Sequence, residues 1–521
     1  MKNIYKIFLG FILAAPLAGC AGFLDQPTLG KENLDTYFQT EEECLKHLNG
    51  CYNALTFYDW WQIESKLVAF DMASDDLWMG NTTQESSWQT ISHYGNPKAA
   101  DGLKEFWQYR YMGILRCNIV ISRVAESPIK DETMRARIIA EAKFLRAYYY
   151  FELVKNFGGV HIVEGLRMPS EVAGITRAST SATYAFIEND LRDAIKVLPQ
   201  KSEYSASDMG RATRGGALGI MGKVLLYQEK FQNASDTLSL VITEGQYDLQ
   251  PQFKDVWTIA TNNGIESLFE VQTTSDKAYV NGTRLPVYTG SRNDSGWSWG
   301  LPTSDLENAF IAAGDTERLM WTIVKHGDNV AGDDHANAQN YQIKPEEHKS
   351  ARINRKFYIP VAQRPETYDS NHNNLNIRLL RYADVLLMYA EACYETGDET
   401  EARWALKKVR DRVSLPEVTS TGTALRDAIR AERRLELACE FNRLYDTRRW
   451  TDDNGKKAIC NIMGQNGSFV RYNTQTSTDQ YENTNMGARQ DKGKTFREDS
   501  ALVVPIPNKD SEKMGRYITF S

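Results

Sequence analysis

Histidine and cysteine are scarce in this sequence, which has 7 of each among 521 residues. The histidines are scattered, and the cysteines show neither a metal-ligand spacing nor the spacing of a small disulfide scaffold. The sequence also lacks a nucleophile elbow, a phosphate-binding loop and an HExxH motif. No catalytic, metal or cofactor motif is therefore present, and we expect a protein that is not an enzyme.

Positive charge is not in excess either. The chain has 61 Lys and Arg against 68 Asp and Glu, which gives a formal charge of −7 at pH 7. Nucleic acids and anionic membranes attract basic surfaces, so we expect neither as a partner. The acidic segment 328–334 suggests calcium, but it lacks the alternating ligand order of an EF-hand. We expect a solvated loop there.

Only one long apolar run stands out, and it lies at the N-terminus. Lys2 and Lys6 precede the apolar residues 7–13, and the segment LAGC follows at 17–20. This order is typical of a secretory signal peptide, and the run is too short for a transmembrane helix, which needs about 20 apolar residues. LAGC resembles a bacterial lipobox, which predicts a signal peptide over residues 1–19 and acylation of Cys20. The alternative is a plain secretory peptide with an incidental cysteine.

Most of the chain after residue 40 has helical periodicity. Apolar residues recur at steps of three and four over 141–157 and over 183–197, which predicts amphipathic helices. The segments 217–241 and 382–413 each predict two helices joined by a short turn, with small residues such as Gly222 where the helices touch. This pattern is typical of tetratricopeptide-like repeats, which must stack on neighbours to bury their apolar faces.

Two long segments, 248–376 and 451–500, lose this periodicity and are rich in Gly, Asn, Asp, Ser and Thr. Loops of such length are usually functional or disordered. We therefore expect one unit over residues 20–521, with a helical scaffold at 36–247 and 377–450. The two loop-rich segments are expected to form a second, irregular lobe on that scaffold.

Tryptophan and tyrosine are abundant, with 11 and 26 residues. A sugar ring stacks on such side chains through its C–H faces, while its hydroxyl groups hydrogen-bond to Asp, Asn or Arg at the edges. Two loop segments, 71–88 and 279–299, combine both kinds of residue. The candidate ligand-binding residues are Asp76, Trp78, Asn81, Trp88, Tyr288, Arg292, Asn293, Trp297 and Trp299.

The alternative for each of these rings is a place in the core. Trp297 and Trp299 are flanked by Ser and Gly, so we expect both to be exposed. Trp60 and Trp61, which form a third aromatic segment with Tyr58, lie near a predicted helix end, and we expect them in the core.

The densest charge pattern spans residues 432–449. Glu432, Glu436 and Glu440 are four residues apart, so on one helix they share a face. Two carboxylates about 5–10 Å apart can act as acid and base in glycoside hydrolysis. The apolar residues between them and the neighbouring arginines favour structural ion pairs instead.

Four separated blocks resemble the SusD/RagB family. They are FLDQP at 23–27, EAKFLRAYYYF at 141–151 with FGGV at 157–160, the segment 378–397 with KKVRDR at 407–412 and ERRLELACE at 432–440, and VPIPN at 504–508. In this order they frame nearly the whole mature chain. The sequence departs from the family at His161, where proline is usual, and in the tail 514–521.

The resemblance implies a mainly α fold, with a tetratricopeptide-like helical-repeat scaffold and an irregular loop-rich ligand-binding lobe. It also implies a lipid-anchored location in the outer membrane, facing the cell exterior. There the protein would form a lid on a SusC-like TonB-dependent transporter and capture oligosaccharides for it without catalysis.

Three other functions stay open at the level of the sequence. One is an oligopeptide ligand, as in RagB-like members of the family. Another is a surface glycosidase, which requires two carboxylates at a cleft in the loop-rich lobe. The last is a purely structural scaffold, which binds the transporter and no small ligand.

Overall fold

The computed structural model describes residues 37–56, 63–78, 94, 101–279, 281–343, 350–364, 372–484 and 496–507. Outside these residues lie the predicted signal peptide, Cys20, the block 23–27, Asn81, Trp88, and Tyr58 with Trp60 and Trp61. Within the described ranges, no helix combines the length and the apolar character that crossing a membrane requires.

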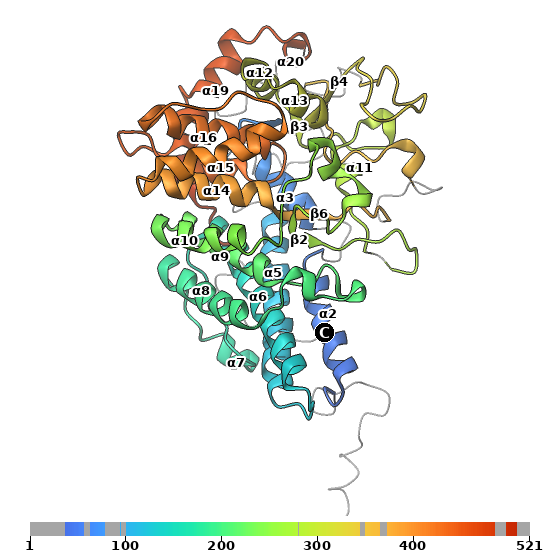
Figure 1. The fold of residues 1–521 in the computed structure, drawn as a ribbon, viewed down its shortest axis with the longest axis vertical. Coiled ribbons are helices and arrows are strands. Elements are labelled where there is room, and N and C mark those ends of the chain that lie inside the picture. The colour runs from blue at the N-terminus through green and yellow to red at the C-terminus, as the bar shows by residue number, and fades with distance from the viewer. Residues whose placement is uncertain are drawn as a thin grey trace, which may run out of the picture.

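A stack of helices forms the larger part of the fold (Figure 1). Its members are α5 (Asp101–Ala125), α6 (Glu132–Phe157), α8 (Thr180–Val197), α9 (Arg214–Tyr227), α10 (Phe231–Thr243), α14 (Tyr382–Glu395), α15 (Glu399–Arg412) and α16 (Gly422–Glu436). Each helix packs against the next, and α10 packs against α14 although a long segment separates them in sequence. The stack is therefore continuous, as repeats that bury their faces on neighbours require. The predicted mainly helical, tetratricopeptide-like architecture is confirmed.

The helix predicted over residues 141–157 is the second part of α6. The helix begins earlier because Asp131 caps it: its carboxylate accepts hydrogen bonds from the backbone N–H groups of Thr133 and Met134 at 2.9 and 3.0 Å, satisfying donors that lack an intrahelical acceptor. At the other end Gly158 has φ 72°, a conformation that glycine adopts without steric cost. Between these two ends, contacts with α5 and α8 bury most residues of the second half of α6.

Both predicted helix pairs are present. α9 and α10 are separated by residues 228–230, and α14 and α15 by residues 396–398. Gly222 allows α9 and α10 to approach closely, since a Cβ atom there would lie 2.4 Å from Cδ2 of Leu238. A side chain at this position would displace Leu238 from its place in the core.

Shorter elements make up the segment between α10 and α14. β2 (Ser267–Val271) pairs antiparallel with β6 (Ile377–Arg381), which brings both ends of this segment together beside the helical stack. Two further antiparallel pairs are β1 (Leu77–Trp78) with β3 (Leu301–Pro302) and β4 (Ile323–Lys325) with β5 (Arg352–Asn354). Its helices are α11 (Leu285–Thr289), α12 (Ser304–Ala312) and α13 (Thr316–Thr322), which lie in the upper part of Figure 1.

The remaining helices lie near the two ends of the described chain and beside the stack. They are α2 (Glu41–Asn53), α3 (Ile63–Asp71), α7 (Pro169–Val172), α17 (Arg443–Arg449), α18 (Ala458–Met463), α19 (Ser468–Arg471), α20 (Gln480–Thr484) and α22 (Glu498–Leu502). α2 packs on α5 and α6, whereas α17 packs on α3 and α18. One large apolar core runs through the stack and into the shorter elements.

Candidate functional site

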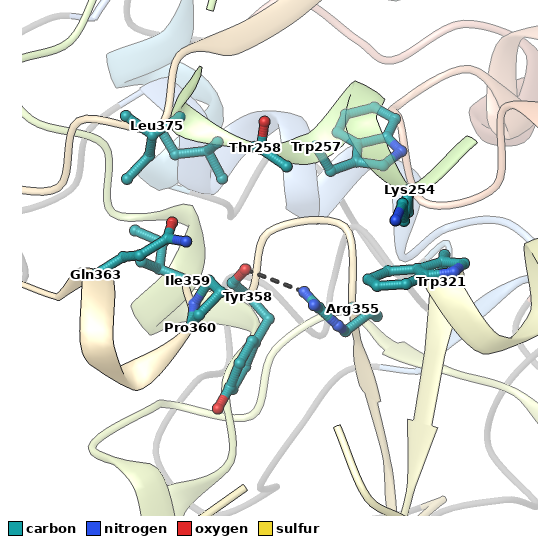
Figure 2. A pocket seen from close by; sticks show the side chains of 11 residues that line it. Lys254, Trp257, Thr258, Trp321, Arg355, Tyr358, Ile359, Pro360, Gln363 and Leu375 are labelled. Atoms are coloured by element: carbon teal, nitrogen blue, oxygen red, sulfur yellow. Dashed lines mark hydrogen bonds between the residues drawn. The ribbon is translucent and has the colours of Figure 1, made fainter. Parts of the chain in front are cut away.

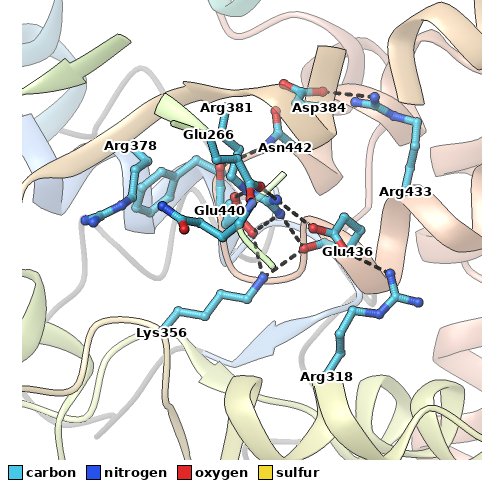
Figure 3. A network of polar contacts seen from close by, with 12 residues as sticks. Glu266, Arg318, Lys356, Arg378, Arg381, Asp384, Arg433, Glu436, Glu440 and Asn442 are labelled. Atoms are coloured by element: carbon cyan, nitrogen blue, oxygen red, sulfur yellow. Dashed lines mark hydrogen bonds and ion pairs between the residues drawn. The ribbon is translucent and has the colours of Figure 1, made fainter. Parts of the chain in front are cut away.

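The glutamates of the dense charge pattern lie in a buried ion-pair network (Figure 3). Arg381 contacts Glu436 at 2.6 Å and Glu440 at 2.7 Å. Arg318 contacts Glu432 at 2.6 Å and Glu436 at 2.9 Å. The predicted structural role of these carboxylates is confirmed by these contacts.

One detail of that prediction is wrong. Glu440 does not continue the face of α16, because the helix ends at Glu436 and both Cys439 and Phe441 adopt a positive φ, 64° and 65°. Glu440 is brought back to the network by Arg381 and by Lys356, whose Nζ atom lies 2.6 Å from its Oε1 atom. Tertiary ion pairs, rather than helical spacing, therefore place it beside Glu436.

The network holds Glu436 in its charged form. Burial alone would raise its pKa, but the guanidinium groups of Arg412, Arg381 and Arg318 hold that pKa well below its usual range. A general acid must carry a proton at the working pH. Glu436 is therefore unsuited to that role.

A neighbouring buried carboxylate, Asp384, provides a test by pH. Its Oδ2 and Oδ1 atoms lie 3.0 Å from Lys223 Nζ and 2.9 Å from Arg433 Nη1. Burial opposes ionisation, but these two cations lower its pKa from 3.8 to about 2. A pKa lowered in the folded state contributes stability above pH 3.8, about 2 kcal/mol here, and this stability is lost as the pH falls toward 2.

Asp384→Asn is therefore expected to destabilise the protein most at neutral pH. The difference in free energy of unfolding between wild type and variant should stay constant from pH 7 to about pH 5 and shrink below pH 4. Urea unfolding at a series of pH values measures it. A difference that grows on acidification would contradict the assigned ion pairs.

The two loop segments that carry the predicted ligand-binding residues lie side by side. β1 pairs with β3, with Trp78 opposite Leu301. Thr303 reinforces this ladder: its backbone N–H donates to the carbonyl of Asp76 at 2.8 Å, and its hydroxyl donates to the carbonyl of Asp75 at 2.9 Å. Residues distant in sequence are thereby brought together in one buried part of the fold.

The segment from α11 to β3 folds back on itself. The N–H groups of Trp297, Ser298 and Trp299 donate to the carbonyls of Val287, Gly290 and Tyr288 at 2.7, 2.9 and 2.7 Å. Gly290 and Gly296 meet at the turn: a Cβ atom on Gly296 would lie 2.2 Å from the carbonyl carbon of Gly290. Only a residue without a side chain fits at this contact.

Three aromatic rings form a cluster on this segment. Tyr288 and Trp299 are stacked, with ring centroids 5.2 Å apart and planes inclined by 14°. Trp297 lies 5.2 Å from Tyr288 and 5.3 Å from Trp299. Tyr288 and Trp299 are 0% and 1% exposed, whereas Trp297 is partly exposed. Our expectation that Trp299 is exposed is therefore wrong, because stacking on Tyr288 and the return of the chain bury it.

Arg292 and Asn293, both exposed, lie in the turn that connects Tyr288 to Trp297. The next residue, Asp294, anchors this turn. Its carboxylate forms a bidentate ion pair with Arg364, at 2.6 and 2.7 Å, and accepts a hydrogen bond from the hydroxyl of Tyr341 at 3.0 Å. Trp297, Arg292 and Asn293 all reach solvent on this anchored turn, and we name them the Trp297 surface.

Asp76 and Trp78 do not face solvent, being 0% and 1% exposed. Asp76 accepts from Arg434 at 2.7 Å, and the indole N–H of Trp78 donates to Glu482 at 2.9 Å. These two predicted ligand-binding residues are therefore structural, as Tyr288 and Trp299 are. Their partners lie far away in the chain, so a local pattern gave no sign of them.

A small hollow beside this region contains aromatic residues that sequence reasoning did not single out (Figure 2). Arg355 lies 5.1 Å from the ring centroid of Trp321 and 5.0 Å from that of Tyr358. Its guanidinium also donates to the carbonyl of Tyr358 at 3.2 Å. The cavity has a volume of only about 40 Å³. The guanidinium of Arg355 already covers the rings of Trp321 and Tyr358, so we assign the hollow a structural role.

A second cavity, of about 340 Å³, was also missed from the sequence. It is lined by amide side chains of α2 and of loops, which no motif unites. Among the described residues, no group of three His, Cys, Asp or Glu side chains is placed to hold a metal ion. In the acidic segment 328–334, Asp333 instead accepts from the hydroxyl of Tyr358 and the N–H of Val361 at 3.0 and 2.8 Å.

Solved structures of SusD-like proteins share this mainly helical, repeat-like fold. The SusD family model matches residues 265–518, and a family model described as "Starch-binding associating with outer membrane" matches residues 23–226. The chain belongs to the SusD/RagB family.

Individual relatives agree with this assignment. SusD-like protein P2 from Formosa agariphila is 25% identical over 505 residues, which cover 91% of this chain and 95% of that protein. A solved structure described as a laminarin-binding SusD-like protein is 27% identical, with a TM-score of 0.72 and coverage of 91% and 97%. A SusD-like protein from Bacteroides fragilis is 26% identical, with a TM-score of 0.70 and coverage of 80% and 87%.

Proposed function

We propose that this protein is a cell-surface lipoprotein of the outer membrane that captures oligosaccharides at the Trp297 surface and delivers them, uncleaved, to a SusC-like TonB-dependent transporter. Acylated Cys20 anchors it, as the segment LAGC at 17–20 predicts. The observation that carries the proposal is the partly exposed ring of Trp297, packed on the stacked rings of Tyr288 and Trp299, with exposed Arg292 and Asn293 on the same turn.

This arrangement suits a sugar. A partly exposed indole offers an apolar face to the C–H groups of a sugar ring, while a guanidinium and a carboxamide beside it hydrogen-bond to hydroxyl groups. The relative described as laminarin-binding supports a glucan as the first ligand to test. An oligopeptide, the alternative ligand class, would have to use the same groups for backbone amides.

The burial and ion pairing of Glu432 and Glu436 support the proposal that capture involves no catalysis. Glu432 and Glu436 are 1% and 0% exposed and are paired with arginines. A glycosidase needs one carboxylic acid and one carboxylate on either side of a bond that lies in a cleft. These two glutamates lie in the core instead.

Replacing Trp297 with alanine is expected to weaken laminarin binding by about 1–3 kcal/mol, the scale measured for bases stacked on aromatic side chains. That corresponds to a dissociation constant roughly 5 to 150 times larger. Isothermal titration of the mature protein with laminarin measures it. Trp404→Ala is the matched control, because Trp404 is 37% exposed but lies on α15 in the helical stack.

Equal losses in the two variants, or none in Trp297→Ala, would contradict the site. Chromatography of the laminarin after incubation separates capture from hydrolysis: unchanged oligosaccharide supports capture, and shortened products support the glycosidase. Titration with a peptide pool in place of laminarin tests the alternative ligand class.

A further inference from the structure

The cavity of about 340 Å³ lies between the end of α2, residues 207–211 and the end of β2. Its volume is within the range of about 300–1,000 Å³ that small-molecule sites occupy. The polar part of its lining consists mainly of Asn49, Asn53, Gln272, Asn281, Ser207 and Arg211. Leu55, Val271 and the exposed side chain of Met209 supply apolar surface.

Two arginines orient the amide groups on α2. Arg211 Nη2 donates to Oδ1 of Asn49 at 3.1 Å, and Arg116 Nη1 donates to Oδ1 of Asn53 at 3.3 Å. Asn49 and Asn53 are four residues apart and therefore neighbours on one helix face. With both oxygens engaged, the two NH₂ groups remain as donors, and neither forms a hydrogen bond within the part of the chain that the structure describes.

The opposite wall is rigid. Gln272 and Asn263 pair through both amide groups, at 2.7 and 3.0 Å. Asn281 donates to the carbonyl of Gln272 at 3.1 Å and accepts from the hydroxyl of Thr56 at 3.0 Å. Gly210 allows this wall to approach the loop, since a Cβ atom there would lie 2.4 Å from the side chain of Gln272. The cavity is thus held open by contacts that need no ligand.

The charged side chains at the cavity form ion pairs with other side chains of the protein. Arg211 pairs with Asp208 at 2.7 Å and with Glu141 at 3.3 Å, and Arg137 pairs with the same two carboxylates at 3.3 and 3.4 Å, so two positive charges meet two negative ones. Glu270 lies 3.5 Å from Arg378 and accepts from the N–H of Asn263 at 2.9 Å. No net charge therefore favours an ionic ligand, such as a peptide terminus or a uronic acid. A neutral molecule with many oxygen atoms fits the remaining donors.

We propose that this cavity is a second ligand site, separate from the Trp297 surface, which binds one or two rings of a neutral sugar. The NH₂ groups of Asn49 and Asn53 donate to adjacent hydroxyl oxygens of that sugar. Met209 and Leu55 cover its apolar face. The site uses none of the residues of the Trp297 surface, so it stands or fails independently of that surface.

Saturation-transfer difference NMR of the mature protein tests this proposal. The probes are D-glucose, D-galactose, D-mannose and N-acetylglucosamine, together with N-acetylalanine methylamide as a neutral peptide analogue. At least one sugar is expected to bind to the wild type and to Trp297→Ala alike. The double variant Asn49→Ala/Asn53→Ala should bind that sugar about tenfold more weakly or worse, because two hydrogen bonds are lost.

Alanine favours a helix more than asparagine does, so the double variant should fold. Ser207→Trp, which places a large side chain at the lining of the cavity, gives the same loss of binding by a different route. Glu42→Ala, an exposed change on the same helix, is the control that keeps binding. The proposal is overturned if no sugar of the panel binds, if both cavity variants bind normally, or if only the peptide analogue binds. Loss of laminarin binding at the Trp297 surface is measured separately and does not affect this result.

Discussion

Replacing Arg381 with methionine is expected to lower the free energy of unfolding by about 3–5 kcal/mol. The guanidinium of Arg381 lies in the core, where it contacts the carboxylates of Glu266, Glu436 and Glu440 at 2.7, 2.6 and 2.7 Å. Methionine keeps the apolar stem and removes the charge. Each of these three buried carboxylates then loses one of its cationic partners, and removing one partner of a buried ion pair is costly.

Lys407→Met is the matched control for this prediction. Lys407 pairs with Asp411 one turn further along α15, where the two side chains are 42% and 51% exposed. Solvent screens an ion pair of this kind, so its loss should change stability little. Urea unfolding of the two variants at pH 7 gives both changes in the free energy of unfolding. Equal changes would show that the buried ion-pair network does not stabilise the fold more than an exposed pair does.

Replacing Gly296 with alanine is expected to abolish the shape of the Trp297 surface. The added methyl group would lie 2.2 Å from the carbonyl carbon of Gly290, which is backbone and has no rotamer to change. The turn must open, at a cost of about 1–3 kcal/mol. Trp297 is then displaced as well, because its N–H donates a hydrogen bond to the carbonyl of Val287 across this turn. Laminarin binding should fall at least as far as in Trp297→Ala.

Gly50→Ala separates this effect from that of any added methyl group. Gly50 lies within α2, and a Cβ atom there would meet nothing within 4 Å. Alanine is the better helix former by up to about 1 kcal/mol, so this variant should bind laminarin normally and unfold at a slightly higher temperature. Thermal unfolding and titration of both variants check the pair. Normal binding by Gly296→Ala would refute the assigned role of the turn.

The helical scaffold could be predicted from the sequence because each helix is marked by the spacing of apolar residues within its own segment. Apolar steps of three and four residues predicted α8, α9, α10, α14 and α15 close to their observed bounds. The start of α6 was placed nine residues too late, because the periodic stripe begins after the cap at Asp131. A cap is set by one side chain rather than by a repeat.

The candidate site was only partly accessible, because its decisive contacts are not local. Trp299 is flanked by Ser and Gly, as an exposed loop residue would be, yet stacking on Tyr288 and the return of the chain bury it. The sequence around Asp76 is typical of an exposed loop, but its carboxylate pairs with Arg434, which lies 358 positions away. Asn49 and Asn53 carry no motif at all, since only the fold brings loops opposite them.

The most direct test of glycan capture at the Trp297 surface is a crystal structure of the mature protein grown with laminarihexaose. We expect an intact oligosaccharide with one sugar ring against the indole of Trp297 and with Arg292 or Asn293 within hydrogen-bond distance of its hydroxyl groups. A cleaved oligosaccharide, or an intact one bound elsewhere while Trp297 is uncovered, would contradict it.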